Sequence, residues 1–382
     1  MSTMKTHSYC AICDTLLSAN NDSKEHVITE AIGGRLKVGG FICKSCNNDT
    51  GRTWDAKLAS QLLPLSHVFG VTRQRGTTPA LPITTTTGEK LTMKPDGRFV
   101  PSNPSFLKEN SVEGVRIKIT ARTIDEAKKM LVGVQRKYPD TNIERLLANA
   151  EFSSSYPTGM VHHQLEFGGE VSGRSIVKSV LALGHYAGIS SNLCSDAIQY
   201  LRDPAASACF GYYYATDLIT NRPVETPLHC VSIKASPETG LILGYVEYFG
   251  IQRVVVCLGK SYCGDVVQSS YSIDPRTGTE LNLSAQLNFS QSEIDAIYNY
   301  EMIPDGAIET AFLAVMPAAL EKKFEAERNQ VITEATEYAF ENCGAKYGET
   351  LTEDHVKKLS GLITEKLTPF ILHNLNSTKL RH

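Results

Sequence analysis

The sequence predicts an α+β protein, in which a small N-terminal module precedes a larger mixed α/β body with a helical C-terminus. Two Cys-x-x-Cys pairs and the segment between them mark the module, which we place at residues 1–72. Strand-like and helical patterns alternate over residues 113–382, which indicates the mixed body. Residues 73–112 lie between the two parts and are expected to form a linker region.

The second half of the module is predicted to contain a helix over residues 47–63. Its apolar residues recur at a spacing of four, which is typical of one helix face. They are Trp54, Leu58 and Leu62. Pro64 follows and is expected to end the helix. The linker is rich in Thr, Pro and Gly and carries a Pro-Asp-Gly turn at 95–97, so one or two short hairpins are expected there.

The body reads as a succession of strands and helices. Residues 114–120 alternate like a strand, and Thr123 is suited to cap the helix that follows. The other expected elements are helices over 142–151 and 172–189, a strand-rich block over 207–272 and helices over 290–376. Arg174 and Lys178 share one face of the 172–189 helix, where they either contact a phosphate or belong to a plain capped helix.

The charge of the chain is small but uneven. The formal net charge is -3, so there is no basic field over the whole chain that would indicate nucleic acid. Residues 1–75 contain nine Lys or Arg against six Asp or Glu, which leaves this part at about +3 and the remainder at about -6. A basic module therefore precedes a mildly acidic body.

The apolar segments argue against a membrane protein. The first residues, MSTMKTHSYC, lack the apolar run of a signal peptide. The longest nearly apolar stretch, residues 307–320, is short and contains Glu309 and Pro317. We therefore expect a cytoplasmic protein without membrane contact, in which cysteines stay reduced. Six cysteines outside the two pairs are expected to be small buried apolar residues: Cys194, Cys209, Cys230, Cys257, Cys263 and Cys343.

The two cysteine pairs predict a structural zinc site. The first pair is Cys10 and Cys13, and the second pair, Cys43 and Cys46, follows after 29 intervening residues. Each pair supplies two thiolates from one turn, and two such turns complete a tetrahedron around zinc. Four thiolates leave no open coordination position, so this zinc is expected to be structural. A disulfide or two unrelated reduced pairs is the alternative.

The module resembles the zinc-containing HNH nucleases, the ββα-metal family. Their pattern is a Cys-x-x-Cys pair, an acidic residue with His, a Gly pair, and a second Cys-x-x-Cys pair followed at once by His or Asn. The chain carries "CAIC", "EHVITEAIGG" and "CKSCNN" in this order, over about residues 8–60. It departs from many members in one respect, because "RLKVGGFI" lacks the Asn that braces the loop after the His. Either Gly39 with Gly40 or another backbone group is expected to replace that Asn, or the loop is braced otherwise.

The resemblance implies a role for each matching residue. His26 matches the general base at the end of the first strand. Glu25 and Asn47 match the residues that hold a catalytic Mg²⁺ or Mn²⁺ ion, with Asn48 as the alternative to Asn47 if the helix begins one residue later. The four cysteines match the structural zinc site.

These residue types suit the hydrolysis of a phosphodiester. A neutral His can take a proton from water near pH 7, and an ion held by carboxylate and amide oxygens can stabilise phosphate charge. Four basic residues of the module are expected to contact the flanking phosphates of nucleic acid. They are Arg35, Lys37, Lys44 and Arg52.

The resemblance therefore implies an endonuclease that acts on DNA, and by analogy with the module a role in bacterial defence or restriction. The C-terminal region, residues 113–382, would then control the module through an activating ligand or a protein partner. A homodimer is expected, because one such site cuts one strand and a duplex break needs two cuts. The alternatives are a non-catalytic four-cysteine zinc module that binds nucleic acid or a protein partner, and a nuclease that acts on RNA.

Overall fold

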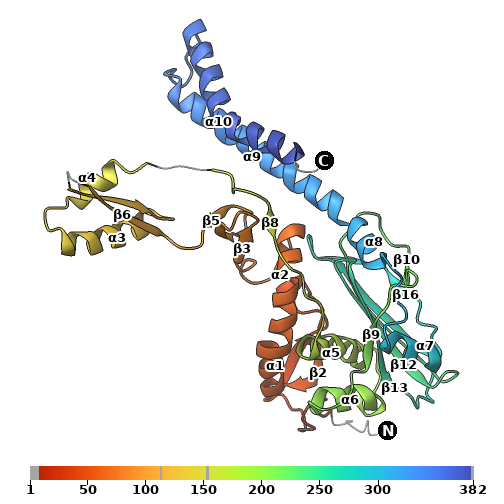
Figure 1. Ribbon diagram of the computed structural model, residues 1–382. Helices are drawn as coiled ribbons and strands as arrows, with labels where there is room; N and C mark the ends of the chain where they lie inside the picture. Colours follow the sequence, from red (N-terminus) through yellow and green to blue (C-terminus); the bar gives the residue numbers. More distant parts are fainter. Residues whose placement is uncertain (1–7, 112–113, 152–154, 380–382) are drawn as a thin grey trace. The chain divides into compact units, whose positions relative to one another are not determined.

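The computed structural model describes residues 8–111, 114–151 and 155–379 (Figure 1). The chain divides into two compact units. Unit 1 consists of residues 1–79 and 165–320, and unit 2 consists of residues 80–164 and 321–382. The fold is α+β, with the N-terminal module, a mixed body and a helical C-terminus, as predicted. The domain boundaries expected at residues 72 and 112 stay a prediction. The two units are groups of residues that pack together, and each unit combines two separate segments of the chain.

The N-terminal module is a hairpin followed by a long helix. Strands β1 (Asp22–His26) and β2 (Lys37–Cys43) are antiparallel and are joined by a loop that contains the 3₁₀ turn η1 (Glu30–Ile32). The helix that follows has three parts: α1 (Lys44–Thr50), the π-helical turn η2 (Gly51–Asp55) and α2 (Ala56–Phe69).

This helix is longer at both ends than the sequence indicates. Pro64 lies inside α2 and does not end it. Leu65 and Phe69 beyond it are buried in the core, and their burial offsets the backbone hydrogen bond that a proline cannot donate. The helix ends instead at Gly70, whose φ of 67° lies in the left-handed region that glycine adopts readily.

A six-stranded antiparallel sheet forms the body of unit 1. Its strand order is β15-β14-β11-β12-β13-β9, and β11, β12 and β13 are buried along almost their whole length. The bounds are β9 Phe210–Tyr212, β11 His229–Ser236, β12 Leu241–Tyr248, β13 Gln252–Gly259, β14 Val267–Asp274 and β15 Thr279–Leu281. Burial of consecutive residues in a strand means that both faces of the sheet are covered. The strand-rich block predicted at 207–272 is confirmed.

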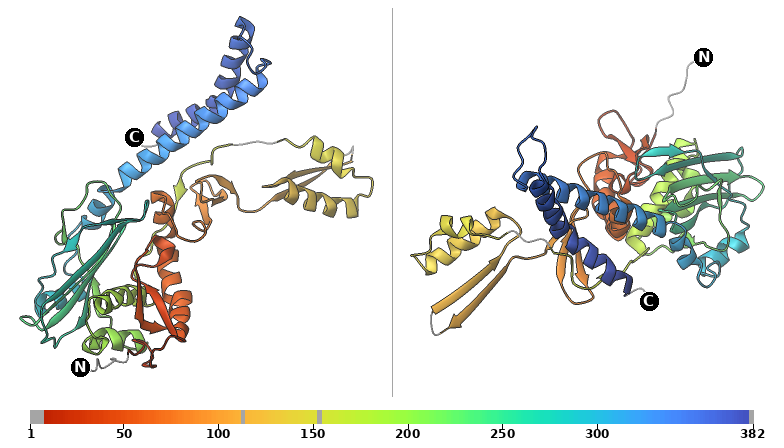
Figure 2. Two further views of the ribbon diagram at one scale, coloured as in Figure 1. Left: turned by 180° about the vertical axis from the view of Figure 1, so that it is seen from behind. Right: turned by 90° about the horizontal axis from the view of Figure 1, so that it is seen from above.

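Helix α5 (Glu170–Tyr186) connects the sheet with the module. It contacts β11 and β12 on one side and β2, η2 and α2 on the other (Figures 1 and 2). Residues 172–184 are buried without interruption, whereas the sequence indicated a single apolar face. One apolar cluster runs through the module, α5 and the sheet, so the module shares its core with the body.

The remaining elements of unit 1 flank the sheet. Helix α6 packs against α5 and β13, and α7 packs against β9. Their bounds are η3 Ser191–Leu193, α6 Ser195–Arg202, β10 Ile219–Thr220, β16 Ser284–Ala285, α7 Gln291–Tyr298 and α8 Ala307–Leu313. Short strands β10 and β16 pair with each other. Five of the six scattered cysteines are buried as predicted, but Cys263 is exposed, because it lies in the loop between β13 and β14.

Unit 2 contains more regular structure than the expected linker. Its segments form a sheet in the order β5-β4-β3-β8 and a separate hairpin of β6 and β7. The bounds are β3 Leu81–Thr85, β4 Lys90–Met93, β5 Phe99–Pro101, β6 Ser105–Ser111, β7 Gly114–Thr120, α3 Ile124–Lys137, α4 Ile143–Ala148, β8 Val161–His162, α9 Met316–Asn342, which begins in unit 1, and α10 Glu353–Lys379. Thr123 caps α3 as predicted, because its side chain accepts a hydrogen bond from the Glu126 amide. Within the described residues, no helix combines the length and apolarity needed to cross a bilayer.

Candidate functional site

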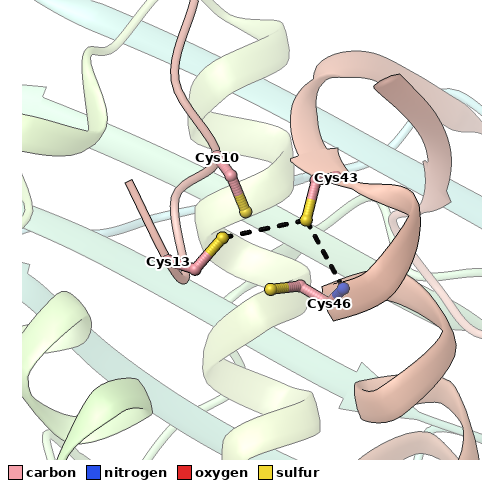
Figure 3. Close-up of side chains that lie close together, drawn as sticks. All are labelled: Cys10, Cys13, Cys43 and Cys46. Atoms are coloured by element: carbon pink, nitrogen blue, oxygen red, sulfur yellow. Dashed lines mark hydrogen bonds between the residues drawn. The ribbon is translucent and has the colours of Figure 1, made fainter. Parts of the chain in front are cut away.

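The four cysteines of the two pairs converge on one point (Figure 3). Cys10 and Cys13 lie in a turn that is joined to β2 by a hydrogen bond of 3.0 Å from the Ala11 amide to the Phe41 carbonyl. Cys43 ends β2, and Cys46 lies in the first turn of α1 and donates its amide to Cys43 Sγ. All four Sγ atoms lie within 4.8 Å of one another.

The geometry of this cluster fits a zinc ion. A tetrahedron with Zn–S distances of about 2.3 Å has S···S edges of about 3.8 Å. Cys13 Sγ and Cys43 Sγ lie 3.8 Å apart. Among the residues that the structure describes, this is the single cluster of three or more His, Cys, Asp or Glu side chains that could hold a metal ion. The donor set indicates a structural zinc, because four thiolates fill every coordination position.

His26 ends strand β1 opposite Lys37 of β2. Its ring is half-buried, and Nε2 is buried without a hydrogen-bond partner among the described residues. Burial, and next the charge of Lys37, lower the pKa of His26 below its ordinary value of 6.5. The imidazole is therefore neutral at pH 7. A neutral ring with an unpartnered nitrogen has the properties that a general base requires.

Glu25, the residue before His26, points into the core of unit 1. The residue is 3% exposed, and its Oε1 atom lies 2.6 Å from Lys178 Nζ of α5. The same ammonium lies 2.7 Å from Asp55 Oδ2, and Lys178 is 1% exposed. Ser175 donates a hydrogen bond of 2.6 Å to Asp55 Oδ1. We call Glu25, Asp55 and Lys178 the buried ion cluster.

One ammonium therefore faces two carboxylates inside the protein. Burial raises the pKa of Glu25, the charge of Lys178 opposes this rise, and the charge of Asp55 adds to it. Burial lowers the pKa of Lys178, but the charges of Asp55 and Glu25 outweigh it, so the net shift is upward. Lys178 thus stays protonated. Asp55 lies in the π-helical turn η2, a rare geometry that is frequent at functional sites.

Asn47 approaches β1 from the first turns of the helix. Its Nδ2 atom donates to Ser23 Oγ at 2.6 Å and lies 3.4 Å from the Lys24 carbonyl oxygen. The structure therefore brings Asn47 to the strand that carries Glu25 and His26. The Glu25 carboxylate itself is held by Lys178. The neighbouring Asn48 is exposed.

The four basic residues expected to contact phosphate differ in their surroundings. Lys37, Lys44 and Arg52 are exposed. Lys44 Nζ donates to the Asn20 carbonyl, and Arg52 donates to Asp49 and to the Asn48 carbonyl, all within the module. Arg35 is turned toward the body, where its guanidinium donates to the Thr277 carbonyl at 3.0 Å.

The buried ion cluster could not be recognised from the sequence as a unit. The sequence offers Lys178 as a contact for a phosphate, but its burial against Glu25 and Asp55 rules out such a contact with a ligand in solvent. The one available signal was a lysine in the apolar run Ile176–Leu183, because a lysine in such a run requires a buried acidic partner. Nothing in the spacing of Asp55 identifies it as that partner.

The comparisons with known proteins agree with the geometry of the module. A family model described as HNH endonuclease matches residues 10–63. No curated protein and no solved structure matches the chain. The matched segment begins at the first zinc cysteine and includes the β1–β2 hairpin, all four cysteines and most of the following helix. Residues 10–63 thus match the HNH endonuclease family, and their four cysteines fit the zinc-containing type of this domain.

Proposed function

We propose that the protein is a divalent-metal-dependent endonuclease that hydrolyses phosphodiester bonds in DNA with His26 as its general base. The observation that carries the proposal is the environment of His26: its Nε2 atom is buried with no partner among the described residues, and burial lowers the pKa of the ring below 6.5, which favours the neutral form. This imidazole ends the strand that the zinc-braced hairpin holds in place. The match of the HNH endonuclease family to residues 10–63 supports the reaction class.

His26 would take a proton from the attacking water at its free nitrogen. Asn47 would contribute its amide oxygen to a divalent ion, because its Nδ2 atom is already used by Ser23 Oγ. Glu25 would supply its carboxylate to the same ion after leaving Lys178, because in this structure the carboxylate is buried against that ammonium. The ion, Mg²⁺ or Mn²⁺, supplies charge that stabilises the phosphate and the leaving oxygen.

The exposed basic residues of the module would contact flanking phosphates. Lys37 is the most direct candidate, because it pairs with His26 across the hairpin. Lys44 and Arg52 are exposed on α1 and η2. Such contacts fix the register of a duplex without reading its sequence. Arg35 is the weakest of the four candidates, since its guanidinium is bound to Thr277.

The test is a cleavage assay on supercoiled plasmid with Mg²⁺ or Mn²⁺, and with EDTA. Wild-type protein is expected to nick or linearise the plasmid only with metal, and His26→Ala is expected to lose at least about 100-fold in rate. His185→Gln is a matched control, because His185 is also half-buried in unit 1 and burial also lowers its pKa. It is expected to cut at the wild-type rate.

Each other outcome has a distinct meaning. Cleavage by His26→Ala at the wild-type rate would refute the role of His26. Cutting of RNA but not of DNA would change the substrate. The assay is repeated with modified DNA, with phage DNA and in the presence of cell extract. If zinc-loaded wild-type protein cuts neither DNA nor RNA under any of these conditions, the module binds without catalysis.

The roles of the remaining chain are proposals that rest on the module alone. We propose that residues 113–382 control the nuclease through a ligand or protein partner, that two copies act on a duplex, and that the protein serves in defence against phage. Plaque counts on cells that express wild-type protein or His26→Ala test the last point. Equal counts would refute it.

A further inference from the structure

The loop between β1 and β2, residues 27–36, begins at the residue after His26. A hydrogen bond of 3.0 Å from the Val27 amide to the Leu36 carbonyl closes it. Because Val27 follows His26 directly, the position of His26 depends on the backbone of Leu36, whose carbonyl accepts this hydrogen bond. Gly40 does not hold this loop, because its amide donates to Asp22 at the opposite end of the hairpin.

Two side chains of the sheet hold the loop from outside the module. Tyr271 of β14 accepts two backbone hydrogen bonds at its hydroxyl oxygen, from Arg35 at 3.1 Å and from Leu36 at 3.2 Å. His229 of β11 is fully buried, and its Nε2 atom lies 2.8 Å from the Ile32 carbonyl oxygen. The Phe249 amide donates to His229 Nδ1 at 3.0 Å, so Nε2 of the neutral ring carries the proton and donates to Ile32.

The turn after β14 closes around the same loop. A Cβ atom on Gly33 would lie 3.1 Å from Pro275 Cβ, which shows how closely the loop packs on this turn. The guanidinium of Arg35 donates to Thr277 in the same turn. The contacts come from residues more than 190 positions away along the chain, on elements that the family match at 10–63 does not include.

We propose that Tyr271 and His229 are positioning residues that hold the β1–β2 loop and thereby place His26 for catalysis, an inference that rests on the proposed nuclease function. They do the work of the Asn that "RLKVGGFI" lacks. The sheet of unit 1 is then part of the nuclease site, and the module is incomplete without it.

The test compares wild-type protein with Tyr271→Phe, which removes the hydroxyl and keeps the ring. Tyr214→Phe is the matched control, because Tyr214 is equally buried in unit 1 and its hydroxyl donates to Ile251, away from the loop. Hydrogen exchange of the peptide that covers residues 27–37 is measured in all three. We expect faster exchange in Tyr271→Phe alone, since Arg35 and Leu36 lose their acceptor. Unchanged exchange would overturn the inference.

Plasmid cleavage supplies the second readout. In Tyr271→Phe we expect kcat to fall at least about tenfold with little change in KM, because a displaced base affects the chemical step more than binding. Faster exchange with unchanged kcat would refute the positioning role.

Failure of the proposed function is distinguishable from failure of this inference. If wild-type protein does not cut, the nuclease proposal fails, while hydrogen exchange still decides whether Tyr271 holds the loop. Zinc content and melting temperature, measured for every variant, detect a general loss of structure. If Tyr271→Phe does not fold, hydrogen exchange of the Arg35 and Leu36 amides is measured in wild-type protein. Protection of these amides supports their hydrogen bonds to Tyr271, and rapid exchange contradicts them.

Discussion

Replacement of Lys178 by methionine tests whether the buried ion cluster joins the module to the body. Methionine keeps an unbranched side chain that is one atom shorter, and it removes the charge. The change leaves the carboxylate of Glu25, at 3% exposure, and that of Asp55 without their ammonium, which lies 2.6 and 2.7 Å away. Removal of one partner from a buried ion pair costs about 3–5 kcal/mol, because the remaining charge is buried without compensation.

The assay is unfolding by urea, followed by tryptophan fluorescence. Trp54 is the single tryptophan of the chain and precedes Asp55, so its signal reports on the region of the cluster. We expect the free energy of unfolding to fall by about 3–5 kcal/mol in Lys178→Met. Arg174→Met is the matched control on the same helix, because the side chain of Arg174 is also buried, at 8% exposure, whereas that of its acidic partner Glu170 is 63% exposed. Loss of Arg174 leaves no buried carboxylate without a partner, so it is expected to cost less than loss of Lys178.

A second pair of variants separates charge from packing. If the unpaired carboxylates cause the loss, Glu25→Gln combined with Lys178→Met should recover part of it, since only one buried charge remains. A loss below about 1 kcal/mol in Lys178→Met would refute the reasoning, because it would mean that the cluster is hydrated or that the carboxylates take up protons at little cost. Equal losses in Lys178→Met and Arg174→Met would point to packing instead.

Three further predictions concern the metal, the pH and the helix. Cys46→Ser is expected to lose zinc, measured by elemental analysis, and to melt several degrees lower; full zinc content would contradict the four-cysteine site. Burial lowers the pKa of His229 to about 4 from 6.5, so its neutral form stabilises the fold above pH 6.5, and about 3 kcal/mol of stability is lost as the pH falls from 6.5 toward 4. Urea unfolding of wild-type protein and His229→Gln between pH 4 and 6.5 measures this loss. If the free energy of unfolding changes with pH in the same way in both proteins, the prediction is wrong. Asn47→Ala is expected to reduce plasmid cleavage at least about tenfold while Asn48→Ala cuts normally, and the reverse order would assign the ion to Asn48.

Local sequence patterns were sufficient to predict the four-cysteine cluster. The spacing of Cys10 and Cys13 and of Cys43 and Cys46 predicts two turns that each offer two thiolates, and the structure places all four Sγ atoms together. The periodicity of the body also predicts most of its elements, including the helix that Thr123 caps. These features depend on residues a few positions apart, and short-range sterics and hydrogen bonding decide them.

Local patterns were wrong where packing overrides propensity. Pro64 signals the end of a helix, yet burial of Leu65 and Phe69 carries the helix to residue 69. Lys178 looked accessible on an amphipathic helix, but α5 is covered on all sides by the module and the sheet. In each case the deciding contact comes from a distant segment of the chain.

The sequence by itself determined the four cysteines of the metal cluster, the strand that ends at His26 and the family that the module matches, because each follows from residues within one short segment. Only the tertiary structure decided that Glu25 meets Lys178 and that Tyr271 and His229 hold the loop after His26. These contacts join residues more than 150 positions apart. Their physical cause is the burial of α5 and the sheet against the module, which brings polar groups together in the core and requires each of them to find a partner.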